Sequence, residues 1–215
     1  MKFIIFALLA VTFQAAAQQS STIKIGLFDP KVTESGMILG YEGTTPIDER
    51  IEMGWSFDWF NKTYVDKRLA EQFNTNYAND IGELNELRAK TNLHGFPVLS
   101  ALRINFPFDP RTQFYVIGNL GLDFLLVFYR DFNNPAEDDW QLAVDFGWRL
   151  GAGVKYKIGS RSDIFIEFNY HNSEPSWEYE VQEPATLTTP ARTRVFERSY
   201  DMSGLMARAG IKYFY

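Results

Sequence analysis

Two residues of the segment His171-Asn172-Ser173 have the side chains needed for nucleophilic catalysis. Residues two apart on an extended strand lie on the same face, so the His171 imidazole could activate the Ser173 hydroxyl. The carboxylate that would orient the imidazole has three candidates downstream, which are Glu178, Glu180 and Glu183. A two-residue motif arises readily by chance. The sequence therefore favours a non-catalytic role for the pair.

A second set of polar residues is charged and falls at alternating positions along the chain. The acids are Glu42, Glu52, Asp58, Asp123, Asp145 and Glu167, and the bases are Lys24, Arg103, Arg149, Lys155, Arg208 and Lys212. If the face that carries them is enclosed, six acids face six bases and ion pairs leave the interior near neutral. The sequence thus predicts a polar network, with no single member singled out as a functional site.

These charged residues alternate with hydrophobic residues at a period of two, which is typical of β-strands with one apolar face. The alternation is clearest over 139–158, where Trp140, Leu142 and Val144 alternate with Gln141 and Asp145. Eight strands are predicted in this way, at 22–30, 35–43, 52–60, 94–108, 113–130, 139–158, 163–181 and 194–215. Pro cannot donate to a strand ladder, so Glu174-Pro175 predicts a bulge or bend in the seventh strand.

The connections alternate between two classes. Residues 44–48, 108–111 and 159–162 have tight-turn composition, whereas 65–91, 132–138 and 182–193 are long and polar, with 29–34 the shortest of this second class. Within the first long connection, 78–90 has a helical apolar spacing. The fifth to eighth strands exceed the ~9–11 residues that cross a bilayer, so their outer ends should protrude as a sheet with edges that could pair with another chain.

Both ends of the chain point to export. Residues 1–17 combine Lys2, an apolar run and Ala15-Ala16-Ala17, which predicts a signal peptide cleaved before Gln18. The last strand alternates apolar residues with small or cationic ones and ends on Tyr213-Phe214-Tyr215. The chain has no Cys and a net charge of −6, which argues against thiol or zinc-thiolate chemistry and against nucleic acid.

This pattern resembles the outer-membrane β-barrel domain family, and in particular the small eight-stranded OmpA-, OmpX- and OmpW-like barrels. The resemblance implies one domain over 18–215, an all-β, eight-stranded antiparallel transmembrane up-and-down barrel in the outer membrane of a Gram-negative-type bacterium. It also implies contact with lipid and lipopolysaccharide, a monomer, and an assembly signal at Tyr213 and Tyr215 that is read by the barrel-assembly machinery.

A soluble, lipocalin-type barrel exported to the periplasm is the competing architecture, because period alone does not say which face is inside. The polar face is rich in Gly and pairs acids with bases, which favours the membrane barrel. An eight-stranded barrel is barely wide enough for its own side chains, so we expect a lumen plugged by ion pairs.

Several functions remain open at this stage. The preferred one is a structural or surface-interaction role through the external loops, without an enzyme activity, cofactor or metal; OmpX-type barrels suggest adhesion. Resemblance to OmpW suggests a conduit or binder for small hydrophobic molecules, lined by Phe28, Ile38, Phe60, Leu99 and Tyr115. Resemblance to the lipid A deacylases, which also have a His-x-Ser pair, suggests a lipid A-modifying hydrolase, although Glu174 replaces the Asn that follows the Ser in that family. The acidic segments at 137–139 and 178–183 could hold divalent cations, with solvated loops as the default interpretation.

Overall fold

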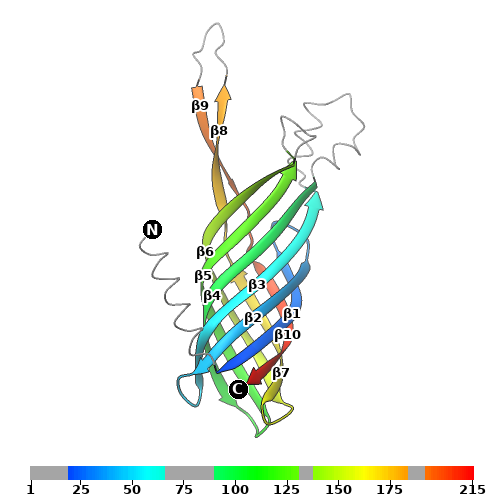
Figure 1. The fold of residues 1–215 in the computed structure, drawn as a ribbon, viewed down its shortest axis with the longest axis vertical. Helices are drawn as coiled ribbons and strands as arrows, with labels where there is room; N and C mark the ends of the chain where they lie inside the picture. The colour runs from blue at the N-terminus through cyan, green and yellow to red at the C-terminus, as the bar shows by residue number, and fades with distance from the viewer. Residues whose placement is uncertain (1–18, 66–89, 131–137, 184–191) are drawn as a thin grey trace.

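The alternating chain closes into a barrel (Figure 1). The computed structural model describes residues 19–65, 90–130, 138–183 and 192–215. The predicted signal peptide and most of the three long connections lie outside these residues, and so does the helix predicted at 78–90 except for Lys90, which begins a strand. Among the described residues, no helix is long and apolar enough to span a membrane.

The described residues form ten strands, eight of which make up the barrel. Those eight are β1 (Ser20–Pro30), β2 (Gly36–Pro46), β3 (Ile51–Val65), β4 (Lys90–Pro107), β5 (Thr112–Arg130), β6 (Asp138–Lys157), β7 (Ser162–Asn172) and β10 (Gly204–Phe214). They pair antiparallel in the order β1-β10-β7-β6-β5-β4-β3-β2, so the first and last strands close the sheet. The predicted eight-stranded antiparallel barrel is confirmed.

Burial decides which face of the sheet lies inside. Large apolar side chains are exposed on the outer surface, including Ile23 at 69%, Phe168 at 65% and Leu150 at 57%. Charged side chains at the alternate positions are buried, including Lys24 at 1% and Glu167 at 0%. A soluble barrel would have the reverse arrangement, so the apolar outside and polar inside are those of a membrane barrel.

The last two predicted strands are each interrupted, the seventh at the predicted bend and the eighth where no interruption was predicted. The seventh ends at Asn172 and the chain resumes as β8 (Ser176–Glu183), while β9 (Arg192–Ser199) precedes the last barrel strand. The first break follows from Glu174-Pro175: Pro175 has no N–H, and the Glu174 N–H donates to the Asp145 carboxylate at 2.6 Å. Strands β8 and β9 form a separate two-stranded sheet that extends beyond the barrel (Figure 1).

The second break brings residues 200–203 back over the barrel mouth. The Tyr200 N–H donates to the Pro175 carbonyl at 3.0 Å, and the Met202 N–H donates to the Ser173 carbonyl at 3.0 Å. On the other side, the carbonyls of Asp201 and Ser203 accept from the β1–β2 turn. This segment therefore joins β1, β7 and β10 at the end of the barrel opposite the C-terminus.

Candidate functional site: the barrel lumen

Glu52 is the centre of the polar network in the half of the lumen near the C-terminal end of the chain. It accepts hydrogen bonds from Lys155 at 3.1 Å, from Arg103 at 3.4 Å and from Lys212. Asn105 Nδ2 donates to the same carboxylate at 3.1 Å. Each cation comes from a different strand, since alternation aims β4, β6 and β10 side chains at one axis. Glu52 thus joins three strands through its two oxygens.

The network continues into the middle of the lumen through Glu42 and Glu167. Arg103 and Lys24 each approach Glu42 to 2.5 Å. Lys24 also contacts Glu167 at 3.2 Å, and Arg208 contacts Glu167 at 2.7 Å. The Tyr115 hydroxyl donates to Glu167 at 2.9 Å. Every member of these pairs is nearly inaccessible to solvent.

Asp58 ends the network. Arg208 lies 2.9 Å from one of its carboxylate oxygens and Arg149 lies 2.6 Å from the other. The connected pairs comprise four carboxylates (Glu42, Glu52, Asp58 and Glu167) and six cations (Lys24, Arg103, Arg149, Lys155, Arg208 and Lys212). All six predicted bases are brought together, but only four of the six predicted acids join them.

The other two predicted acids lie elsewhere. Asp123 is buried and its Oδ2 is 3.0 Å from His171 Nε2. Asp145 is half-buried and accepts from the Glu174 backbone N–H, which stabilises the bend between β7 and β8. Both lie nearer the β8–β9 end of the barrel than the network does, because β5 and β6 are long enough to hold two levels of inward-facing residues. The expected balance of charge therefore does not hold within the connected pairs.

Other inward polar residues were not singled out from the sequence. Asp163 is buried opposite Lys212 in the β7–β10 register. Asn105 contacts Glu52, and Thr44 accepts from Lys212 at 2.9 Å. Each shares strand parity with a charged residue that was singled out, such as Asn105 with Arg103. The alternation of inward and outward residues was the available signal for all three, but it was applied to neither the neutral residues Asn105 and Thr44 nor the acid Asp163 at the start of β7.

The opposite half of the lumen is apolar. Phe28, Ile38 and Phe60, predicted as cavity-lining residues, belong to one buried cluster with Leu93, Leu125, Val127, Ala143, Tyr200, Met202 and Met206. Tyr115 packs instead with Ile117 and Phe165, beside the polar network. Leu99 is fully buried but falls in neither cluster. Tyr200 and Met202 come from the 200–203 segment, so the interruption before β10 supplies part of this filling.

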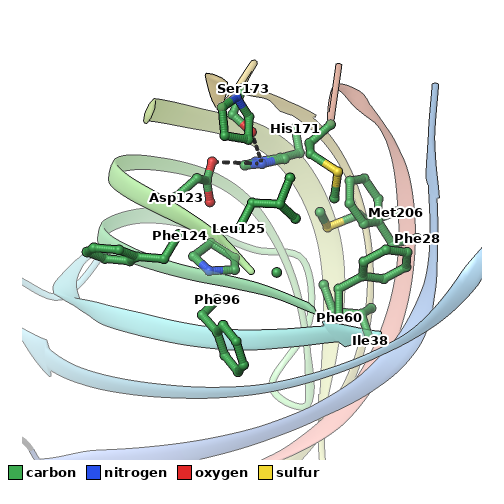
Figure 2. Close-up of a pocket in the computed structure, with 14 residues that line it drawn as sticks. Phe28, Ile38, Phe60, Phe96, Asp123, Phe124, Leu125, His171, Ser173 and Met206 are labelled. Atoms are coloured by element: carbon green, nitrogen blue, oxygen red, sulfur yellow. Dashed lines mark hydrogen bonds and ion pairs between the residues drawn. The ribbon is translucent and has the colours of Figure 1, made fainter. Parts of the chain in front are cut away.

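A small pocket of about 20 Å³ separates the apolar cluster from His171 (Figure 2). It has room for about one water molecule. In Figure 2, Phe28, Ile38, Phe60 and Met206 lie on one side of the pocket, and Asp123, His171 and Ser173 lie on another. Gly95 and Pro97 of β4 also line it. The space exists where β4 has no side chain at Gly95.

The geometry of His171 does not match a catalytic relay. His171 Nε2 is 3.2 Å from Ser173 Oγ and 3.0 Å from Asp123 Oδ2, so both partners contact the same nitrogen (Figure 2). His171 Nδ1, which a relay would hold against the acid, has no hydrogen-bond partner among the described residues. As predicted, both residues face inward, and each is 2% exposed. Of the predicted acids, Glu178 is exposed on β8, and the side chains of Glu180 and Glu183 lie outside the described part of the structure.

No group of three or more metal-ligating side chains occurs among the described residues. Glu137 and the side chains of Asp138 and Asp139 fall outside that description. The acidic segments therefore remain predictions only.

The predicted assembly residues lie at the C-terminal end of β10, with Tyr213 in the strand and Tyr215 just after it. Tyr213 and Tyr215 are 44% and 71% exposed, with ring centroids 5.8 Å apart. The Tyr215 N–H donates to the Gln19 carbonyl at 3.1 Å, which fixes the chain end beside β1. These rings are accessible from outside the barrel.

Known structures share this architecture. OprG, an outer membrane protein from Pseudomonas aeruginosa, aligns with a TM-score of 0.56 at 16% identity, over 93% of this chain and 96% of OprG. A major outer membrane protein from Thermus thermophilus gives 0.55 at 10% identity, over 93% and 100%. Neisserial surface protein A gives 0.53 at 8% identity, over 91% and 95%. At these identities the likeness establishes the fold alone.

No curated protein sequence matches the chain. The model of the outer membrane protein beta-barrel domain matches residues 3–188, which is most of the sequence. Together with the apolar exterior and the closed strand order, this match settles the class of membrane protein. The chain belongs to the outer membrane protein beta-barrel domain family, and it is an outer-membrane β-barrel.

Proposed function

We propose that this protein has a structural or surface-interaction role at the cell envelope, exerted through its external end while ion pairs close its lumen. The observation that carries the proposal is the connected series of contacts from Lys212 and Glu52 to Asp58 and Arg149. With a barrel this narrow, ion pairs that fill the cross-section leave no continuous water path.

The apolar cluster supports the same conclusion from the other end. Phe28, Phe60 and Met206 are at most 2% exposed, and Met202 is 5% exposed. An ion that passed the barrel mouth would first meet a layer of buried apolar side chains, where a charge is costly to desolvate. The two layers oppose conduction for different physical reasons.

Single-channel recording of the refolded barrel in a planar bilayer tests the closed lumen. We expect no current steps from the native protein, while a general porin recorded in the same bilayer supplies the positive control. Reproducible steps from the native protein would overturn the closed lumen and point to transport.

The external role has a separate test. Exchanging residues 65–91, 132–138 and 182–193 for unrelated polar sequences of equal length should abolish surface binding to a partner cell while the barrel remains folded. A matched exchange of the turn at 108–111 should have no effect. Retained binding after exchange of all three long connections would place the activity on the barrel itself.

We extend the proposal to assembly: the protein is exported by a signal peptide at 1–17, recognised by the barrel-assembly machinery through Tyr213 and Tyr215, and monomeric in the membrane. The exposed aromatic pair at the end of β10 supports the recognition step.

A binder of small hydrophobic molecules is the second candidate, and the pocket beside Gly95 favours it. Between β3 and β4 the pairing passes from Phe57–Val98 to Phe60–Gly95, without pairs at Asp58 and Trp59. Pro97 lacks an N–H, which explains the interruption in the wall of the pocket. A methyl group at Gly95 would meet only ordinary contacts, the nearest at 3.7 Å, and the longer side chain of Gly95→Leu should fill the pocket.

An apolar fluorescent probe tests this second candidate. If the pocket binds such molecules, Gly95→Leu should weaken probe binding, whereas Gly118→Leu, which has open space around it, should not. Equal binding by the native protein and both variants would exclude the pocket.

A further inference from the structure

The outer surface of β3 and β4 carries a row of nearly parallel aromatic rings. Phe57 stacks on Phe96 with centroids 6.3 Å apart and planes 20° apart. His94 stacks on Phe96 at 6.3 Å and 10°, and Trp59 stacks on His94 at 6.3 Å and 15°. The planes of these four rings are nearly parallel, and the rings lie on the outside of the barrel; Phe96 also lines the small pocket beside Gly95.

Two amides border the same surface. The Nδ2 atoms of Asn61 and Asn92 each lie 3.1 Å from His94 Nε2, and Asn61 Nδ2 donates to Asn92 Oδ1 at 3.0 Å. Trp59 Nε1 donates to His94 Nδ1 at 3.3 Å. The rings and amides are therefore held in place by one another. We name this surface the ring–amide patch: Phe57, Trp59, Asn61, Asn92, His94 and Phe96.

The patch remains accessible. Phe57 is 39% exposed and Trp59 is 37% exposed, while the other four members are partly exposed. None of the six carries a permanent charge. A surface of aromatic rings and amides offers apolar area together with hydrogen-bond donors and acceptors, without the Arg or Lys groups that phosphate recognition uses.

Strand geometry places the patch at one edge of the lipid-facing belt. Outward residues of β4 are Phe106, Ile104, Leu102, Ser100 and Val98, followed by Phe96, His94 and Asn92. A tilted strand rises about 2.5 Å along the barrel axis per residue, so Phe96 lies about 25 Å from Phe106, the height of the apolar band. Because Phe106 lies at the end with the short turns, Phe96 marks the outer boundary and the amides lie in the headgroup layer.

We propose that the ring–amide patch binds the saccharide headgroup of an outer-leaflet glycolipid, whose acyl chains lie along the lipid-facing belt below. A pyranose ring has one face of C–H groups that packs on aromatic rings, and hydroxyls at its rim that pair with amides. The patch presents both in the right order along the barrel axis. It is also continuous with the membrane contact, so a lipid that contacts Phe57 and Val98 reaches Asn61 and Asn92 with its headgroup.

Two amphiphiles that share the same dodecyl chain but differ in their headgroup test the proposal. The full-length protein is exposed to an equimolar mixture of dodecyl maltoside and dodecyl octaethylene glycol ether, and retained molecules are counted by native mass spectrometry. We expect preferential retention of the maltoside, and about fivefold less preference in Trp59→Leu and in Asn92→Leu. Equal retention of both amphiphiles by the native protein would overturn the proposal.

The chain provides a matched control in Trp148, which faces outward on β6 with 38% exposure. Trp148→Leu should keep the preference for the maltoside. An equal loss of preference in Trp148→Leu would mean that any outward aromatic residue at the interface has the same effect, and it would overturn a specific role for the patch. Heat-dependent mobility on gels verifies that each variant is folded; Asn61→Leu is a further variant of the patch should one fail to fold.

Two more arms identify the source of the sugar. Lipopolysaccharide stripped of phosphate should bind as well as the intact form, and loss of binding on stripping would overturn the saccharide assignment. Free maltose should compete poorly against dodecyl maltoside, since it lacks the chain that contacts the belt. Equal competition by free maltose would overturn the assignment to a membrane lipid.

Discussion

Arg149 on β6 and Asp58 on β3 form a buried ion pair of 2.6 Å between strands that are not neighbours in the barrel. The pair therefore crosses the lumen, and its 91-residue separation in the chain means that it forms only when the sheet closes. Arg208 on β10 contacts the other oxygen of the same carboxylate. One acidic side chain thus holds three strands at fixed distances across the interior.

Replacing that carboxylate should destabilise the barrel strongly. Asp58→Asn leaves Arg149 and Arg208 buried without their shared counter-ion, and breaking a buried pair costs about 3–5 kcal/mol. Urea unfolding of the refolded protein in lipid vesicles, followed by tryptophan fluorescence, measures the change. Glu49→Gln removes the same charge from an exposed turn and should leave the free energy of unfolding nearly unchanged. Equal effects of the two substitutions would contradict a structural role for the network.

Close strand contact makes a different prediction at Gly54. A methyl group there would collide with the Gly43 carbonyl oxygen and lie 2.8 Å from Thr44 Cα, both backbone atoms of β2. Gly54→Ala should therefore cost about 1–3 kcal/mol of unfolding free energy. At Gly118 a methyl group meets nothing within 4 Å, so Gly118→Ala should change stability little. The same urea titration compares them, and a neutral Gly54→Ala would mean that β2 and β3 separate easily.

Alternation alone was enough to predict the barrel, because a two-residue period fixes which residues share a face whatever the loops do. Acidic and basic residues such as Glu52 and Arg103 both fall on the polar face of their strands, and this indicated which face lies inside. The interruption at 200–203 was missed, since the alternation was carried through Tyr200 and Met202, which fall at the same alternate positions as the inward residues Met206 and Arg208. The inward turn of this segment depends on long-range hydrogen bonds to Ser173 and Pro175, which no local pattern contains. The separation of Asp123 from the network likewise depends on strand register.

The 200–203 segment should respond to acid through Asp201. Partial burial raises the pKa of Asp201, but hydrogen bonds from Ser203 and Lys31 outweigh it and hold the pKa below its ordinary value of 3.8. The same hydrogen bond, with the charge of Asp201, raises the pKa of Lys31. A lowered carboxyl pKa means that the contact stabilises the fold above pH 3.8 and is lost as the pH falls through the lowered value.

Amide hydrogen exchange at Met202 and Val32 measures this response. Exchange, corrected for its intrinsic pH dependence, should become faster at pH 3 than at pH 6 in the native protein. Asp201→Asn should show the faster exchange at both pH values. Unchanged protection of Met202 at pH 3 would show that its bond to Ser173 holds the segment without the Lys31–Asp201 pair.

The His171–Ser173 pair should have no hydrolytic activity on lipid A. Both Ser173 and Asp123 contact the same imidazole nitrogen, so the acid does not orient the ring for proton transfer from the hydroxyl. Mass spectrometry of lipid A from outer membranes with native protein, with Ser173→Ala and without the protein should give identical masses. A change in lipid A mass that depends on Ser173 would refute a non-catalytic role for the pair and would favour the lipid A-modifying hydrolase.

The terminal tyrosine should matter for assembly more than for stability. Tyr215 is 71% exposed, and its ring contacts Tyr213 at the edge of the barrel, so its removal leaves no internal cavity. Tyr215→Ala should reduce folded protein in the outer membrane of cells several-fold, yet refold in detergent as well as the native chain. Tyr156→Ala, at an outward position 41% exposed on β6, is the matched control and should assemble normally. The proposed recognition acts before the barrel closes, so a defect seen only in cells would mark an assembly signal. An equal defect in detergent would assign Tyr215 to stability instead.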